Sequence, residues 1–502
     1  MTDPNHHSGP NLTGPNPAGP NPTGRNPAAT DQGAGVGRAR LGRRDLLKLG
    51  AAGAAGLTLA GGASAGRAAT AGTSARGASR RRAKARNVIF LVVDGMSQGI
   101  FTLGDMVTRH YRDGTPSAWM RLYQDGAPMS QCRTASADSL VTDSAAASCA
   151  WATGVHINNG AINVHEGREL KPILLTAKEA GKSTGLVTTT RVTHATPAGF
   201  VANVPSRNME NQIARQILDR EVDVVLGGGA RHFPGELIDS RRRELSVLRS
   251  RDELLQRALA PDERRLLGLF SESHMDYALD RPADQPQLFE MALAAVRRLD
   301  RNPEGFVLQI EAGRVDHGGH GTDAIASIYD QAAFDVTIER LREWARDRDD
   351  TLIIITTDHG CGGPELTVYG QASHDGFDRV VNARHTMTHA MRRMGTGPDR
   401  VQRLASELND AMRVELSGGE VDWLERVLNN RERASGFDGM NGDSAAVATV
   451  LANHLGINFV SGNHTGEMVH ATALGPGAER IRPSMDNIDL YDMAVQAAAL
   501  EA

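Results

Sequence analysis

Cysteine is scarce in this sequence, and an excess of basic residues is absent. The 502 residues include three cysteines, Cys132, Cys149 and Cys361, too few and too scattered for a disulfide framework or a cysteine-based zinc site. Any bound metal must therefore be held by His, Asp and Glu. The 55 basic residues are outnumbered by 60 acidic ones, so no basic field indicates a nucleic-acid partner.

Long apolar runs are also lacking, apart from one short stretch near the N-terminus. With 40% hydrophobic and 23% charged residues, the composition is typical of a soluble globular protein. The length suffices for one large α/β domain with insertions or for two to three average domains. No stretch beyond residue 65 is apolar enough to span a bilayer, so we expect no membrane anchor in the mature chain.

The first 86 residues are predicted to precede the folded domain. Residues 1–37 are rich in Pro, Gly and Asn and have little to bury, which predicts disorder. Within 38–65, Arg43-Arg44 precede an apolar run and an A-x-A cleavage motif that ends at Ala65. This order is typical of a twin-arginine export signal; a buried helix or an anchor is the alternative, but the run is shorter than the roughly 20 residues of a span. Residues 66–86 are expected to be a flexible basic lead, and the mature protein to be periplasmic or secreted.

Three segments resemble one another: each is a continuous apolar, β-branched run that ends in an acidic residue. These are residues 87–95, 305–311 and 351–360, which end in Asp94, Glu311 and Asp358-His359. Such runs indicate strands buried on both faces, as in a parallel sheet. Helix-like stretches lie between them, at 287–299 and 324–346, so we expect a doubly wound α/β sheet. In such sheets ligands bind beyond the carboxyl ends of the strands.

Acidic residues at three strand ends favour a metal site. One strand-terminal Asp is weak evidence, because an acid often caps the next helix. Three together would repel one another unless a positive group lay among them. Asp316 and His320 are four residues apart, so one helical turn would place both on one side. His464 lies in a glycine-flanked loop and, taken alone, is more often a surface or packing histidine than a ligand.

Ser144 is a candidate nucleophile at the start of a predicted helix. Asp143 or Ser144 can be the N-cap, an alanine run follows, and Gly154 ends the helix. A helix N-terminus suits phosphate, although a plain capping serine explains the local sequence as well. No G-x-S-x-G elbow or histidine-based triad surrounds Ser144, so a nucleophilic serine would need a metal ion to lower its pKa.

Taken together, these motifs resemble the alkaline phosphatases. The matching segments, in family order from about residue 87 to 500, are VDGM, VTDSAAA, AWATG, TTTRVTHATPA, LGGG, EAGRVDHGGH, TTDHG and GNHTGE. The resemblance implies a catalytic domain over 87–502. Its fold would be a three-layer α/β/α sandwich around a mostly parallel sheet, with insertions near the active site. A helical insertion over 363–460 is expected to cover the site or contribute to a homodimer interface.

The resemblance also implies two zinc ions, one magnesium ion and the roles of individual side chains. The first zinc would be bound by Asp316, His320 and His464, and the second by Asp94, Asp358 and His359. Magnesium would be bound by Asp94, Thr196 and Glu311. Ser144 would face the second zinc, and Arg207 would grip two phosphate oxygens. His194 and His317 would lie just outside the ligands, near metal-bound water or phosphate. Cys361, beside the second zinc in sequence, is expected to pack rather than to bind metal.

The function expected from this resemblance is hydrolysis of small phosphate monoesters through a phosphoserine on Ser144. A sulfatase is disfavoured because the segment after Ser144 lacks the Pro and Arg of the C/S-x-P-x-R pattern. Phosphodiesterase or phosphoglycerate mutase activity remains an alternative within the superfamily. A non-catalytic, exported phosphate- or metal-binding protein is the alternative from another class, although every matched ligand is present. Cys132 and Cys149 could pair, but their spacing does not establish a bond.

Overall fold

A computed structural model describes residues 84–257, 260 and 264–500. The predicted disordered leader (1–37), the predicted export signal (38–65) and residues 66–83 of the predicted lead lie outside the described residues. The end of the lead belongs to the fold: Ala85 is buried, and Arg86 forms ion pairs with Asp300 and Asp350. The expected flexible lead therefore stops before Ala85. Export and a homodimeric assembly stay predictions.

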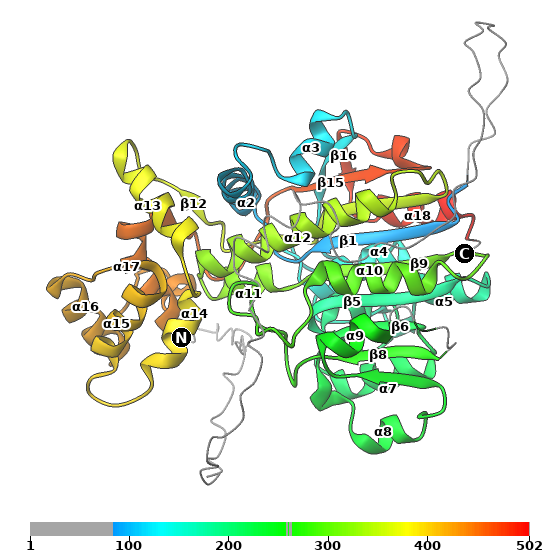
Figure 1. The fold of residues 1–502 in the computed structure, drawn as a ribbon, viewed down its shortest axis with the longest axis horizontal. Coiled ribbons are helices and arrows are strands. Elements are labelled where there is room, and N and C mark those ends of the chain that lie inside the picture. The colour runs from blue at the N-terminus through cyan, green and yellow to red at the C-terminus, as the bar shows by residue number, and fades with distance from the viewer. Residues whose placement is uncertain (1–83, 258–259, 261–263, 501–502) are drawn as a thin grey trace, which may run out of the picture. The chain divides into compact units, whose positions relative to one another are not determined.

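The core of the molecule is one ten-stranded sheet (Figure 1). Its order is β16 (Ser484–Asp486), β2 (Met129–Arg133), β15 (Val469–Leu474), β10 (Thr351–Thr357), β1 (Asn87–Val93), β9 (Phe306–Ala312), β5 (Ser183–Arg191), β6 (Val224–Gly228), β8 (Arg265–Leu269) and β7 (Leu245–Leu248). All neighbours pair in parallel except at β15, which is antiparallel to both β10 and β2. The carboxyl ends of the central strands therefore meet at one edge of the sheet.

Side chains of β1 alternate between two apolar cores, one on each face of the sheet. Ile89, Leu91 and Val93 belong to one core, whereas Val88, Phe90 and Val92 belong to the other. This explains why the strand reads as a continuous apolar run, since both of its faces are buried. The expected three-layer sandwich around a mostly parallel sheet is confirmed.

Helices cover both faces. One core includes residues of α2 (Gln98–Tyr111), α3 (Ala118–Gln124), α9 (Arg251–Arg257), α10 (Leu288–Leu299) and α12 (Ala324–Trp344). The other includes residues of α4 (Ser144–Thr153), α5 (Ile173–Glu179), α6 (Ala195–Gly199), α7 (Glu210–Asp219), α8 (Gly235–Asp239) and α18 (Asp489–Ala498). Figure 1 shows α10 and α12 crossing the near face of the sheet.

Local capping explains the helix boundaries and confirms the predicted helices. Gln287 forms a capping box with Glu290 at the start of α10, and Asp323 accepts from the backbone N–H of Ala326 at the start of α12. Asp143, rather than Ser144, is the N-cap of α4, and Gly154 ends that helix in the left-handed conformation with φ +71°. Ser144 is therefore free of the capping role.

Beyond β10 the chain forms short strands and a group of five helices. β11 (Gly360–Cys361) pairs with β14 (His464–Thr465), and β12 (Glu365–Leu366) pairs with β13 (Ile457–Asn458). Earlier in the chain, between α4 and α5, β3 (Val164–His165) pairs with β4 (Arg168–Glu169). The helices are α13 (Gln371–Asn382), α14 (Met387–Met394), α15 (Arg400–Met412), α16 (Gly418–Leu428) and α17 (Asp443–Leu455). They fall within the predicted insertion, 363–460, and Figure 1 shows them together on the side where β1 ends.

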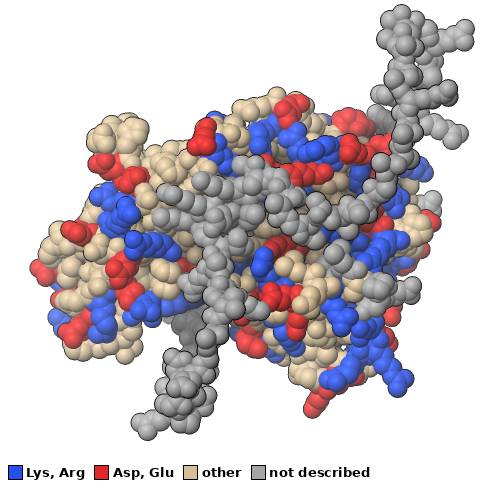
Figure 2. Space-filling view, in the orientation of Figure 1, with Lys and Arg blue, Asp and Glu red and all other residues tan. Residues whose placement is uncertain are grey.

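Membrane spans, surface charge and the state of the cysteines can also be judged from the described residues. None of the helices described there has the length and apolar character needed to cross a bilayer. Basic and acidic side chains intermix on the face shown in Figure 2. All three cysteines are buried free thiols, so Cys132 and Cys149 do not pair.

Gly99, in the first turn of α2, permits close contact between that helix and the segment after β11. A Cβ at Gly99 would lie 1.8 Å from the carbonyl oxygen of Pro364. We expect Gly99→Ala to lower the free energy of unfolding by about 1–3 kcal/mol, because the backbone must move to admit the methyl group. Urea unfolding measures the change.

Gly419→Ala in α16 is the matched control, since a Cβ there meets nothing within 4 Å. It should leave stability unchanged or raise it by up to about 1 kcal/mol through helix propensity. Equal effects of the two substitutions would contradict the close contact.

Candidate active site

The carboxyl ends of β10, β1 and β9 bring three carboxylates together. Asp94 directly follows β1, Asp358 directly follows β10, and both are fully buried. Glu311, also fully buried, was expected to end its strand, but β9 continues to Ala312. β9 extends to Ala312 because it pairs with β1, in which Val93 is in register with Ala312. The sheet edge therefore carries a compact acidic cluster.

Gly95 allows a fourth carboxylate to approach this edge. Its φ of +76° turns the chain after β1, and its N–H donates to Asp358 Oδ1 at 2.9 Å. A Cβ on Gly95 would lie 2.5 Å from the Cα of Asp316. Asp316 belongs to α11 (Arg314–His320), so the missing side chain lets this helix lie directly against the end of β1.

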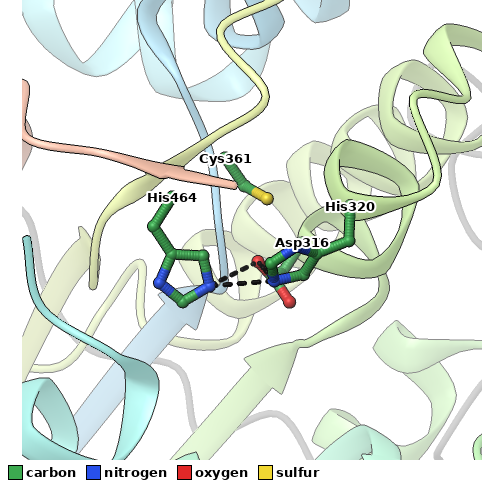
Figure 3. Close-up of side chains that lie close together, drawn as sticks. All are labelled: Asp316, His320, Cys361 and His464. Atoms are coloured by element: carbon green, nitrogen blue, oxygen red, sulfur yellow. Dashed lines mark hydrogen bonds and ion pairs between the residues drawn. The ribbon is translucent and has the colours of Figure 1, made fainter. Parts of the chain in front are cut away.

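Asp316, His320 and His464 converge on one point, as Figure 3 shows. Asp316 and His320 are four residues apart on α11, and this spacing places His320 Nε2 3.5 Å from Asp316 Oδ1, as the predicted helical turn requires. His464 Nε2 lies 3.4 Å from the same oxygen and 2.9 Å from His320 Nε2. His464 was expected in a loop, but it lies in β14, paired with Cys361 of β11. That pairing brings His464 to residues about a hundred positions earlier in the chain.

Backbone carbonyl groups fix the tautomers of these two histidines. His320 Nδ1 lies 2.7 Å from the carbonyl oxygen of Gly462, and His464 Nδ1 lies 2.8 Å from that of Thr142. Because a carbonyl oxygen only accepts, both Nδ1 atoms carry the hydrogen and both Nε2 atoms present lone pairs in the neutral rings. Two lone pairs directed at each other call for a cation between them.

Cys361 Sγ lies in the same group, within 4.8 Å of the ligand atoms of Asp316, His320 and His464. Burial, together with the nearby Asp316 carboxylate, raises the pKa of the Cys361 thiol well above its ordinary value. The neutral thiol is a poor ligand, and a Cβ on Gly319 would lie 2.8 Å from its sulfur. These contacts support the packing role expected for Cys361.

A second and a third group surround Asp94. His359 Nε2 lies 3.1 Å from Asp358 Oδ2 and 3.7 Å from Asp94 Oδ1. On the other side of Asp94, ligand atoms of Asp94, Glu311 and His194 lie within 4.8 Å of one another. Thr196 Oγ1 lies 3.5 Å from Asp94 Oδ2. Asp94 thus faces both groups, as the resemblance implies for a carboxylate shared by two ions.

The electrostatics of this cluster fit cations. Among the described residues, four buried carboxylate oxygens of the cluster have no hydrogen-bond partner: Asp94 Oδ1, Glu311 Oε1, Asp316 Oδ1 and Asp358 Oδ2. Burial and the carboxylates of Asp358, Asp316 and Glu311 raise the pKa of Asp94 well above its ordinary value. Burial likewise raises the pKa of Glu311 to about 7, although Thr188 donates to its carboxylate. Metal ions would satisfy these atoms and remove the repulsion.

Ser144 and Arg207 lie beside the cluster and are linked through Asp143. Ser144 Oγ is buried and lies 3.3 Å from His359 Nε2. Asp143 caps α4 with one oxygen and accepts from Arg207 Nη1 at 3.0 Å with the other. Arg207 Nη2 donates to His194 Nε2 at 3.1 Å. The guanidinium is therefore fixed relative to the serine hydroxyl.

Sequence reasoning missed several residues that support the site. His317, which was expected just outside the ligands, accepts from Arg314 at 2.8 Å and packs against the rings of His194 at 5.4 Å and His274 at 4.2 Å. His274 follows β8 without any motif to indicate it. Thr188 and Thr190 of β5 hold the Glu311 carboxylate. The sequence feature that could have indicated these two residues is the run of threonines at the end of β5.

Comparison with known proteins identifies the family. The family model for alkaline phosphatases matches residues 85–500. The chain belongs to the alkaline phosphatase family. Alkaline phosphatase 4 of Bacillus subtilis is 30% identical over 422 residues, which cover 81% of this chain and 87% of that protein.

Solved alkaline phosphatases share the fold. The Thermus thermophilus enzyme is 32% identical, with a TM-score of 0.77 over 85% of this chain and 95% of its own. The cold-active enzyme of a Shewanella species is 26% identical, with a TM-score of 0.69 over 83% of this chain and 100% of its own. The expected family and enzyme class are confirmed: the chain is a phosphomonoesterase of a metal-dependent family.

Metal removal tests the repulsion among the buried carboxylates. We expect chelation to lower the midpoint of thermal unfolding. An ion whose free concentration is a hundred times its dissociation constant adds about 2.7 kcal/mol to the free energy of unfolding, and chelation removes this contribution. Without metal, and at a pH high enough to ionise Asp94, whose pKa is raised, Asp94→Asn should unfold at a higher temperature than wild type, since one of the repelling charges is gone. With zinc and magnesium restored, the order should reverse.

The exposed Asp347 offers a matched control. Asp347→Asn should follow wild type in both conditions. A metal-free Asp94→Asn protein that is less stable than wild type would contradict the repulsion.

Proposed function

We propose that the chain hydrolyses phosphate monoesters to an alcohol and inorganic phosphate through a phosphoserine on Ser144. The observation that carries the proposal is the position of the Ser144 hydroxyl. It is buried at the first turn of α4, 3.3 Å from His359 Nε2, with Arg207 held beside it through Asp143. The free backbone N–H groups and the dipole of that helix favour an anion at this place.

We propose two zinc ions and one magnesium ion in the acidic cluster. Asp316, His320 and His464 would hold the first zinc, and Asp94, Asp358 and His359 the second. Mixed carboxylate and imidazole ligands suit zinc, whereas the oxygen ligands of Asp94, Thr196 and Glu311 suit magnesium. The unpartnered atoms support this assignment. When bound, the ions supply Lewis-acid stabilisation of negative oxygen and lower the pKa of serine and water.

The side chains of Arg207 and Ser144 would bind the phosphate and attack it, respectively. Arg207 donates two parallel hydrogen bonds to two phosphate oxygens, and its contacts with Asp143 and His194 orient it for this. Ser144 Oγ loses its proton and attacks phosphorus in line, the P–O bond to the leaving group breaks, and a phosphoserine forms while the departing alkoxide takes up a proton and leaves as the alcohol. Water then attacks the phosphoserine, the Oγ–P bond breaks, Ser144 regains its proton and phosphate leaves.

Ser144→Ala tests the nucleophile. We expect turnover of p-nitrophenyl phosphate to fall by at least about 10³-fold, because no other residue can carry the phosphoryl group. The labelled phosphoenzyme, trapped by acid quenching, should disappear.

Ser148→Ala is the matched control. Ser148 lies in the same helix, but its hydroxyl donates to the carbonyl groups of Ala145 and Ala195. Its phosphoenzyme should persist. A wild-type burst in Ser144→Ala would overturn the mechanism, and faster turnover of bis-p-nitrophenyl phosphate by wild type would indicate a diesterase.

Arg207→Lys tests the phosphate grip. Lysine cannot supply the two parallel donors, so we expect KM and the inhibition constant of inorganic phosphate to rise by about 10- to 100-fold. The exposed Arg215 of α7 provides the control, Arg215→Lys, which should leave both constants unchanged. A normal phosphate inhibition constant in Arg207→Lys would contradict the assignment.

A further inference from the structure

A second group of metal-binding side chain types lies outside the active site. Asp280 comes from the segment between β8 and α10, His385 directly precedes the N-cap of α14, and His389 lies in the first turn of that helix. Their ligand-capable atoms lie within 4.8 Å of one another. None of the three belongs to the alkaline phosphatase motifs recognised in the sequence, and none has a role in the proposed reaction.

Both imidazoles face a single carboxylate oxygen. His385 Nδ1 lies 3.0 Å from Asp280 Oδ1, and His389 Nδ1 lies 3.9 Å from the same atom. The two rings stack with their centroids 4.0 Å apart and an interplanar angle of 13°, so one imidazole must rotate before both nitrogen lone pairs, which lie in the ring planes, point at a single ion. In a tetrahedral zinc site with bonds of about 2.0–2.1 Å, ligand atoms lie roughly 3.3 Å apart. The distances from Asp280 Oδ1 to His385 Nδ1 and to His389 Nδ1, 3.0 Å and 3.9 Å, lie on either side of this tetrahedral value.

The carboxylate is already oriented for this arrangement. Thr386 Oγ1 donates to Asp280 Oδ2 at 2.6 Å, which turns Oδ1 toward the imidazoles. Hydrogen bonds of this kind, from outside the ligand set, orient carboxylates in metal sites. The side chains of His385 and His389 are 34% and 32% exposed, whereas that of Asp280 is 12% exposed. Solvent can therefore reach the group and supply a water ligand.

We infer that Asp280, His385 and His389 bind a divalent ion of the zinc class, with water completing the coordination. One carboxylate and two imidazoles form a ligand set that suits zinc, and three protein ligands with one open position are a common zinc arrangement. The ion links the segment before α10 to α14, and so fastens the group of helices to the sheet domain. In the alternative, Asp280 only forms hydrogen bonds with His385 and Thr386, and no ion is bound.

Zinc content tests the inference. Wild type and His385→Gln/His389→Gln are dialysed against the same zinc and magnesium solution, and bound zinc is measured by plasma mass spectrometry. Wild type should bind one zinc per chain more than the double variant. His454→Gln is the matched control, because His454 Nε2 faces only Glu420, at 3.2 Å, and its loss should leave the zinc content unchanged.

His389→Gln alone provides a second variant that leaves Asp280, His385 and the Thr386 cap in place. It too should lose the additional zinc, and zinc should raise its unfolding temperature less than that of wild type. Equal zinc content in wild type and the His389 variant would overturn the inference. Phosphatase turnover is measured separately, so failure of the proposed reaction would leave this result interpretable.

Discussion

Repulsion among buried carboxylates is the constraint on which the site and much of the surrounding fold depend. Asp94, Glu311, Asp316 and Asp358 come from three strand ends and one short helix, and each is at least nine-tenths buried. A parallel sheet brings the strand ends together as a matter of topology, whereas Gly95 admits the helix by lacking a side chain. The backbone thus imposes a charge density that must be offset either by protons, as the raised pKa values of Asp94 and Glu311 indicate, or by cations, whose proposed binding would contribute directly to folding.

The protein directs its metal ligands with backbone groups rather than with further charges. The carbonyl oxygen atoms of Gly462 and Thr142 fix the tautomers of His320 and His464. Thr142 immediately precedes Asp143, the residue that caps α4 and holds Arg207. One short segment therefore orients His464, the helix that carries Ser144 and the guanidinium of Arg207, to which we have assigned the roles of metal ligand, nucleophile and phosphate binding. A shift of this segment would disturb all three together.

The strands and the acidic residues at their ends could be predicted from the sequence because their signals are local. A β-branched run that ends in Asp94, and the four-residue spacing of Asp316 and His320, reflect single elements. The local sequence around His464 did not indicate its place in the site, which only the family resemblance implied, because that place depends on β11 pairing with a strand about a hundred residues later. His274 escaped notice for the same reason, since only tertiary packing brings its ring against His317.

The helices after β10 are tied to the active site through the segment that follows the metal ligands. Asp323, three residues beyond His320, is fully buried and accepts from the backbone N–H groups of Ala326 and Thr388. It therefore caps α12 and holds the start of α14 at once. Asp280 contacts the same turn of α14 from the other side, through Thr386. Because two buried or half-buried carboxylates hold this turn, the group of helices is positioned by the same part of the chain that positions His320.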